Sequence, residues 1–213
     1  PYQTIGSLML HFPEHESATD YYRDLDIEKA VATVRYKVGE VTYTREVLSS
    51  FADDVVIVRL TADKPKSLSF TALFQSPLDH EVKSWNKRLV LTAKGKEHEG
   101  VPGAIRTETQ VEAKNEGGRV VVKGKSLRVE GADAVTLYIS SATNFVNYKN
   151  VSGNAHKKAA AYLDAARKKP YKQAKTEHIA SYRQLFDRVK LDLGTSDTAT
   201  QETHIRVKHF NEG

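Results

Sequence analysis

Paired carboxylates are the side chains in this sequence that could most directly perform acid–base chemistry. Two carboxyl groups, acting as acid and base, can cleave the acetal bond between two sugars. The available pairs are Asp24/Asp26, Asp53-Asp54 and Glu97/Glu99. Asp24 and Asp26 would share one face of an extended segment, and Asp53-Asp54 directly precedes an apolar run, where a turn is expected. Both positions favour structural or solvated roles, so we predict no catalytic residue in this chain.

Histidine is the other residue type with possible chemistry, and the chain has eight of them. His11 and His15 flank Pro13, which prevents the helical i, i+4 spacing that an HExxH-type zinc site needs. No segment resembles the GxSxG turn that presents a serine nucleophile. The absence of cysteine excludes disulfides and thiolate ligands. We therefore predict no metal site and no cofactor.

The segment after residue 143 carries side chains suited to sugar recognition. Aromatic rings pack on the apolar faces of sugars, and amides can both donate hydrogen bonds to hydroxyls and accept them. The alternative is a polar loop whose phenylalanine is anchored in the core. The only tryptophan is likewise either a sugar platform or a partly buried loop anchor. The candidate substrate-proximal residues are Asn144, Phe145, Asn147, Tyr148 and Trp85.

A β pattern extends from Tyr2 to about Phe145. Apolar and charged residues alternate through ATVRYKVGEVTYTREVLSS, around a turn at Gly39, as expected for strands with one buried face. The run DDVVIVRLTA is nearly continuous in its apolar centre and predicts a strand covered on both faces. Turn signals recur about every 8–12 residues, which favours an antiparallel β-sandwich. The predicted fold class is mainly β, a sandwich of the supersandwich kind followed by a short α-helical linker.

The composition changes after Asn154, where alanine, lysine and glutamine favour helices. Pro170 should separate two helices. The first has an apolar stripe at Ala159, Tyr162, Leu163 and Ala166. For the second, from about Thr176 to Val189, we expect burial against the sandwich of Ile179, Tyr182, Leu185 and Phe186. The expected organisation is a sandwich over residues 1–150, a helical linker with a short extended segment over 151–194, and a polar tail over 195–213.

The charge pattern limits the classes of partner. The net charge is +5 and the pI about 9.2, and the excess lies in Lys157–Lys175, which is typical of a solvated helix face. No nucleic-acid-binding motif accompanies these lysines. No run of about 18 apolar residues exists that could cross a membrane. We predict neither a nucleic-acid partner nor a membrane partner.

Six segments in order resemble one enzyme family, glycoside hydrolase family 95, which comprises α-L-fucosidases and some α-L-galactosidases. The resemblance extends over nearly the whole chain, although no single segment is a catalytic signature. The segments are YQTIGSLML (2–10), YYRDLDIEKAVATVRYKVGEVTYTREVLSS (21–50), DDVVIVRLTADKPKSLSF (53–70), HEGVPGAIRTETQV (98–111), GADAVTLYISSATNF (131–145) and HIASYRQLFDRVKLDLG (178–194).

The resemblance implies an amino-terminal β-sandwich and linker whose catalytic (α/α)6 barrel is absent from this chain. In that family the glutamate acid, and the asparagine and aspartate that activate water, lie in the barrel. The expected function is therefore that of a non-catalytic segment of a bacterial parent enzyme that removes α-L-fucose, or α-L-galactose, from glycans with inversion. Its partners would be fucosylated glycans and its own barrel, in the periplasm or outside the cell. The alternative is a stand-alone carbohydrate-binding or cell-surface module.

Overall fold

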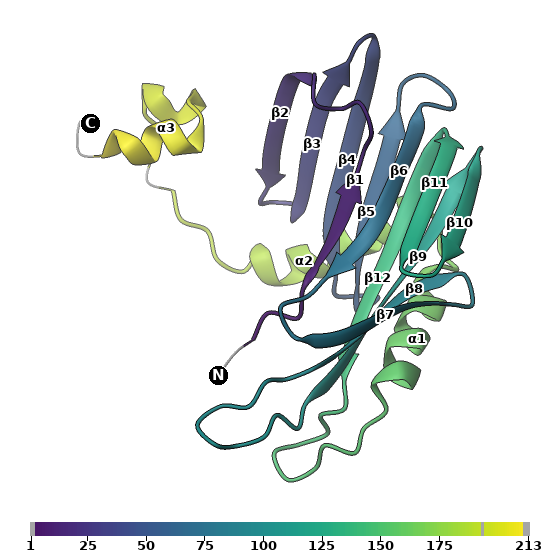
Figure 1. The fold of residues 1–213 in the computed structure, drawn as a ribbon. Coiled ribbons are helices and arrows are strands. Elements are labelled where there is room, and N and C mark those ends of the chain that lie inside the picture. The colour runs from purple at the N-terminus through teal and green to yellow at the C-terminus, as the bar shows by residue number, and fades with distance from the viewer. Residues whose placement is uncertain (1–2, 193, 211–213) are drawn as a thin grey trace.

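A computed structural model describes residues 3–192 and 194–210, and strands precede all helices in it (Figure 1). The strands are β1 Ser7–His11, β2 Thr19–Asp26, β3 Val31–Val38, β4 Val41–Ser50, β5 Val55–Ala62, β6 Leu68–Gln75, β7 Asp79–Trp85, β8 Arg88–Lys94, β9 Arg106–Glu116, β10 Arg119–Lys123, β11 Ser126–Ala132 and β12 Ala134–Thr143. The helices are α1 Ala155–Ala166, α2 Tyr171–Phe186, a 3-10 turn Asp197–Thr200 and α3 Thr203–Lys208.

Two antiparallel sheets lie face to face. The larger has eight strands in the order β2-β3-β4-β5-β12-β9-β8-β7, and the smaller has four in the order β1-β6-β11-β10. Their inner faces enclose one core that contains Phe70, Leu127 and Leu137, all at most 2% exposed. The predicted fold class, a mainly β antiparallel sandwich followed by helices, is confirmed. The predicted hairpin turn is also present, with Gly39 at φ +57° between β3 and β4.

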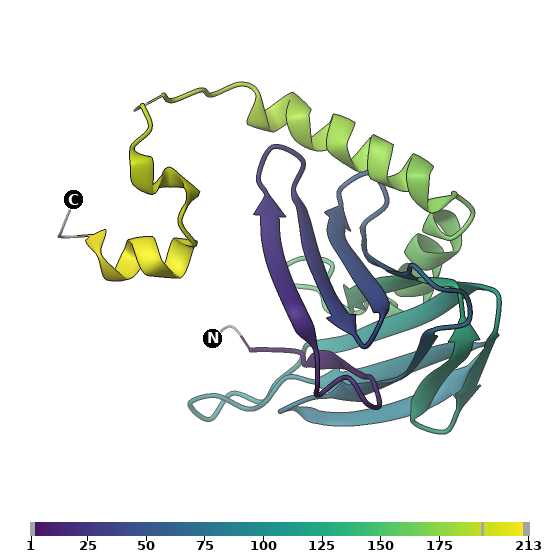
Figure 2. The same cartoon turned by 90° about the horizontal axis from the view of Figure 1, so that it is seen from above.

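The strand β5 is covered on both faces, as its apolar run predicted. Val58 and Leu60 face the core between the sheets. Ile57, on the opposite face, packs with Leu48 and Tyr138 in a second core beneath the helices. The alternation along one central strand thus gives three layers, with helices α1 and α2 on the outer face of the large sheet (Figure 2).

Helix α1 is held on the large sheet by the stripe that the sequence predicted. Ala159, Leu163 and Ala166 are fully buried. The helix begins at Asn154, whose Oδ1 accepts a hydrogen bond of 2.8 Å from the backbone N–H of Lys157. It ends before Pro170, which forms the N-cap of α2.

Helix α2 corrects the second helical prediction. It starts earlier than Thr176 and buries Ala174 and His178 instead of the expected stripe. Leu185 is 59% exposed and Phe186 37% exposed. The physical reason is that only the first half of α2 lies on β4. The second half continues past the β2–β3 turn, which it touches through a 2.8 Å hydrogen bond from the Tyr182 hydroxyl to the carbonyl oxygen of Ile27.

Residues 187–192 and 194–210, the part of the chain described after α2, contain no strand. Lys190, Leu191 and Asp192, expected to be extended, lie in no regular element, and Leu193 lies outside the described residues. Helix α3 stands apart from the sandwich (Figures 1 and 2) and buries none of its residues.

Candidate functional site

Two long loops extend side by side beyond one end of the sandwich, and Asn144 joins them (Figure 1). One loop, residues 95–105, connects β8 to β9, and the other, residues 144–154, connects β12 to α1. The Asn144 side chain accepts a hydrogen bond from the N–H of Arg106 (2.8 Å) and donates to the carbonyls of Ala104 (3.2 Å) and Val151 (2.8 Å). The amide of Asn144 is therefore engaged by backbone and acts as the support of both loops.

The remaining candidates in this loop face solvent. Phe145 is 48% exposed and Tyr148 is 84% exposed, so Phe145 is not the core anchor that the structural alternative required. Asn147 stabilises a tight turn, in which its Oδ1 accepts a hydrogen bond from the N–H of Lys149. The loop thus presents two aromatic rings on a backbone held by Asn144.

Trp85 lies elsewhere. It ends β7, whereas the loop pair adjoins the Asp79 end of that strand, where Asp79 pairs with Lys94 and Lys94 pairs with Arg106. Six residues of extended chain separate the two ends, or about 20 Å. The five candidates therefore fall into two groups, four in the loop and Trp85 on its own.

The outer face of β7, β8 and β9 carries polar residues in register. Glu81 pairs with Thr92, which pairs with Glu108, and the next row toward the loops is formed by Asp79, Lys94 and Arg106. A groove of about 540 Å³ lies over these rows, bordered by Ala155 in the first turn of α1. This volume is in the usual range for small-ligand sites, about 300–1,000 Å³.

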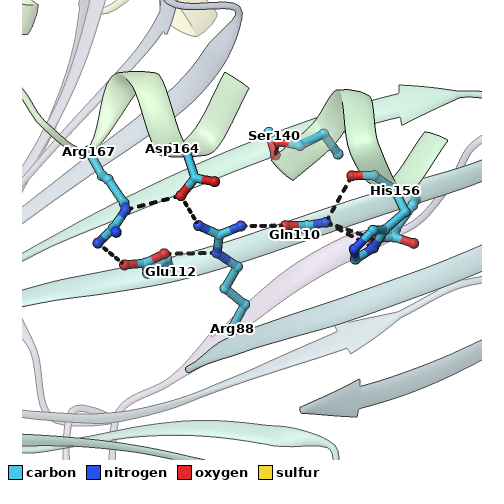
Figure 3. Close-up of polar contacts among 9 residues, drawn as sticks. Arg88, Gln110, Glu112, Ser140, His156, Asp164 and Arg167 are labelled. Carbon is cyan, nitrogen blue, oxygen red and sulfur yellow. Dashed lines mark hydrogen bonds and ion pairs between the residues drawn. The ribbon is translucent and has the colours of Figure 1, made fainter. Parts of the chain in front are cut away.

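A buried ionic network anchors α1 next to this groove (Figure 3). The Arg88 side chain is only 6% exposed. It donates to Glu112 (2.9 Å), to Gln110 (3.0 Å) and to Asp164 on α1 (2.6 Å). Arg167 then donates to Glu112 and Asp164 at 3.0 and 3.3 Å. Strands β8 and β9 are thereby connected to the second half of α1.

The ionisation of this network follows from its contacts. Burial by itself would lower the pKa of Arg88, but hydrogen bonds from its guanidinium to Glu112 and Asp164 outweigh burial and raise that pKa. The hydrogen bond from Arg88 also lowers the pKa of Asp164. Arg88 and Asp164 therefore stay charged near neutral pH, and the network is a structural anchor and not a proton-transfer pair.

A second set of contacts holds the first turn of α1. Nδ1 of His156 donates to Glu108 at 2.7 Å, and the Gln110 amide donates to the same oxygen at 2.7 Å. The Trp85 and His156 rings meet edge to face, with centroids 4.6 Å apart. Because Trp85 stands on β7 and His156 on α1, this contact spans the intervening β8.

One member of each carboxylate pair takes a structural position. Asp26 accepts hydrogen bonds from the N–H groups of Glu28 and Lys29 in the β2–β3 turn. Asp53 is buried and binds the Lys169 ammonium at 2.6 Å, and the Glu97 side chain accepts from the N–H of Gly100. Across residues 3–192 and 194–210, no cluster of three or more His, Cys, Asp or Glu side chains could hold a metal ion. In the same part of the chain no helix is long and apolar enough to span a membrane.

Comparisons with known proteins place the chain in a family. The profile described as "Glycosyl hydrolase family 65, N-terminal domain" matches residues 1–148. The chain therefore belongs to this family of glycoside hydrolase N-terminal domains. Among solved structures, the chain is similar to that of a "Putative kojibiose phosphorylase from human microbiome", with a TM-score of 0.60 and 11% sequence identity over 86% of this chain and 28% of that one. At this low identity the similarity supports the fold alone.

The two curated relatives that match this chain both carry names of fucosidases. "Alpha-L-fucosidase 2" of Arabidopsis thaliana is 31% identical over 98% of this chain and 29% of its own length. "Probable alpha-fucosidase A" of Aspergillus oryzae (strain ATCC 42149 / RIB 40) is 23% identical over 99% of this chain and 31% of its own length. The chain thus spans about three tenths of these relatives. Together with the family match, they confirm the predicted resemblance to the amino-terminal domain of a family 95 glycoside hydrolase, and the family match adds the relation to family 65.

Sequence reasoning missed the groove and the Arg88 network. One signal was present in RTETQVE, residues 106–112, where alternate positions are polar and would all point outward from a covered strand. That pattern could have indicated a polar contact with a neighbouring helix. Its partners on α1, Asp164 and His156, could not be identified from the pattern.

Proposed function

We propose that this chain is the non-catalytic N-terminal domain of a longer α-L-fucosidase whose active site lies in a separate (α/α)6 barrel. The match to a protein named for this activity, at 31% identity over 98% of the chain, carries the proposal. The positions of the carboxylates agree with it, since Asp26 and Asp53 are occupied by a turn and an ion pair. α-L-Galactosides are the alternative substrate, and hydrolysis with inversion is the expected course.

In this proposal the paired loops are the part of the domain that reaches the barrel. They extend furthest from the sandwich at one end, and they present Phe145 and Tyr148 to the outside. Aromatic rings at such a position can pack on sugar faces. The domain's role is then to orient the linker and to complete the substrate-binding surface.

The test is an assay of fucose release from fucosyllactose by the 213-residue chain and by the longer protein that contains it. The chain alone should give no release above background. The longer protein should release fucose first as the β-anomer, observed by proton NMR, because inversion converts an α-linkage into a β-product. Turnover by the chain alone would contradict the division of labour, and no release by the longer protein would contradict the substrate.

A matched pair of variants in the longer protein tests the loop. Tyr148→Ala should raise KM for the fucosylated substrate. Phe51→Ala, which removes another highly exposed aromatic ring in the β4–β5 turn (72% exposed), should not. An unchanged KM in Tyr148→Ala would remove this residue from the substrate surface.

A further inference from the structure

The β2 edge of the large sheet carries large apolar side chains in solvent. Strand β2 stands at the end of the strand order and pairs with β3. The side chains that are more than half exposed on this strand and in the turn after it are Tyr21, Tyr22, Leu25 and Ile27. On β7, the strand at the opposite edge, no apolar side chain is exposed to that extent. The two free edges of the sheet therefore differ, and only the β2 edge is rich in exposed apolar groups.

The second half of α2 continues this apolar edge. The Tyr182 hydroxyl donates to the carbonyl oxygen of Ile27 in the β2–β3 turn. The Tyr182 and Phe186 rings stack with their centroids 5.2 Å apart, and Leu185 lies three residues from Tyr182, on a neighbouring part of the helix surface. The turn and the helix thus form one continuous area. We call it the β2–α2 surface, and it consists of Tyr21, Tyr22, Leu25, Ile27, Tyr182, Leu185 and Phe186.

The composition of the β2–α2 surface is that of a protein interface. Aromatic residues, tyrosine among them, are enriched where proteins meet, and a contiguous apolar patch on a protein surface marks an interaction site. Charged groups next to the patch are already paired. Asp26 binds Lys29 at 2.6 Å, and Glu28 lies 3.5 Å from Arg183. Apolar groups bordered by polar ones are the usual arrangement of an interface with a dry centre and a hydrated rim.

The path of the chain indicates what covers this surface. Helix α2 leads from it into residues 187–192 and 194–210, which lie away from the sandwich (Figure 2). Val189 and Leu191, the first apolar residues of that segment, are also exposed. The chain spans 29% and 31% of the two curated relatives, so about seven tenths of each lies outside the match. Under the proposed function the catalytic domain follows α2 and is tethered beside the β2–α2 surface, at an effective concentration that a free second copy does not reach.

We propose that the catalytic domain of the longer protein packs on the β2–α2 surface, so that the second half of α2 is buried between that domain and the β2–β3 turn. The identity of the covering domain rests on the proposed function, whereas the surface is defined by its exposed side chains. The contact is apolar and adds to the one proposed for the paired loops. It would fix the orientation of the sandwich relative to the barrel, which a tether alone does not do.

The absence of cysteine from the chain makes the burial of single positions measurable. Leu25→Cys and Leu185→Cys are introduced separately into the 213-residue chain and into the longer protein, with Val121→Cys, at an exposed position of β10, as the control. Reaction with a maleimide is followed by mass spectrometry of the peptide that contains the new cysteine. Because all three positions are exposed in this chain, the substitutions should leave the urea midpoint nearly unchanged.

The cysteines at positions 25 and 185 should react about tenfold or more slowly in the longer protein than in the 213-residue chain, because burial excludes the reagent and disfavours the reactive thiolate. The cysteine at position 121 should react at similar rates in both. Equal rates at all three positions would overturn the proposal, and so would a slowing at position 121 as large as at the other two.

A second copy of the chain is the competing occupant. If labelling at positions 25 and 185 slowed only as the concentration of the 213-residue chain rose, while it stayed fast in the longer protein, self-association would cover the surface and the proposal would be wrong. Fucose release by the longer protein is measured separately. Protection of positions 25 and 185 in a longer protein that releases no fucose would uphold the interface and contradict the substrate, so the two proposals can fail independently.

Discussion

Helix α1 and the second half of helix α2 differ in how far the sheet covers their apolar faces, although both are amphipathic in sequence. Helix α1 buries Ala159, Leu163 and Ala166 completely and is joined to the sheet by Arg88. The second half of α2 leaves Leu185 59% exposed and Phe186 37% exposed. An apolar stripe at helical spacing therefore indicates which face of a helix is apolar, but it does not say whether the sheet extends far enough to cover that face.

The contrast predicts the largest loss of stability for a change in the buried stripe of α1. Leu163→Ala removes a side chain with no exposed surface, beneath which lie Ile57 and Tyr138. The free energy of unfolding should fall by about 3–5 kcal/mol, because both transfer and cavity terms are lost. Urea denaturation followed by circular dichroism measures the change. A loss below about 1 kcal/mol would mean that α1 is not seated as described.

The next effect concerns the ionic anchor of the same helix. Arg88→Ala leaves Glu112 and Gln110 without their buried partner, and it should cost about 3 kcal/mol, the low end for breaking a buried pair, since Asp164 is 53% exposed and can be hydrated. Lys64→Ala, which removes the exposed ion pair with Glu40, is the control and should leave the urea midpoint nearly unchanged. Equal shifts in the two variants would show that burial of the network contributes nothing.

A smaller effect is expected in the exposed half of α2. Leu185→Ala should change the free energy of unfolding of this chain by about 0.5 kcal/mol or less, because the side chain is 59% exposed. The same substitution in the longer protein tests whether another domain covers the stripe. A loss of about 2 kcal/mol or more there would indicate burial against that domain, whereas a comparable loss in the short chain would contradict the exposure of Leu185.

The smallest effect depends on pH and arises between the sheets, away from both helices. Burial among Phe12 and Tyr43 lowers the pKa of His15, and Arg45 lowers it further, whereas the nearby Glu16 raises it. The unfolded chain, with an ordinary histidine pKa of about 6.5, then binds a proton at higher pH than the folded chain. The stability that His15 contributes is present above about pH 6.5 and decreases as the pH falls below it.

His15→Gln should accordingly make the free energy of unfolding less dependent on pH between about 6.5 and 5. Urea midpoints measured across this interval for both proteins give the comparison. A slope that the substitution leaves unaltered would contradict the lowered pKa of His15 in the folded state.

The sequence by itself determined the order and type of most elements. Alternation specified the strands, Gly39 the β3–β4 turn, and Pro170 the break between the helices, because each depends on contacts within a few residues. The continuous apolar run at Val55–Ala62 even indicated coverage on both faces. The motifs in register also carried the family resemblance, which needed no three-dimensional information.

Only the tertiary structure decided which distant residues share a site. The pairing of β7, β8 and β9 places Glu81, Thr92 and Glu108 in one row, and it separates Trp85 from the loop at Asn144, although both had been grouped as sugar contacts. The same packing leaves Leu185 beyond the sheet. These outcomes depend on strand order and on where the sheet ends, which are set by the sum of many long-range contacts and are not encoded in any local spacing of residues.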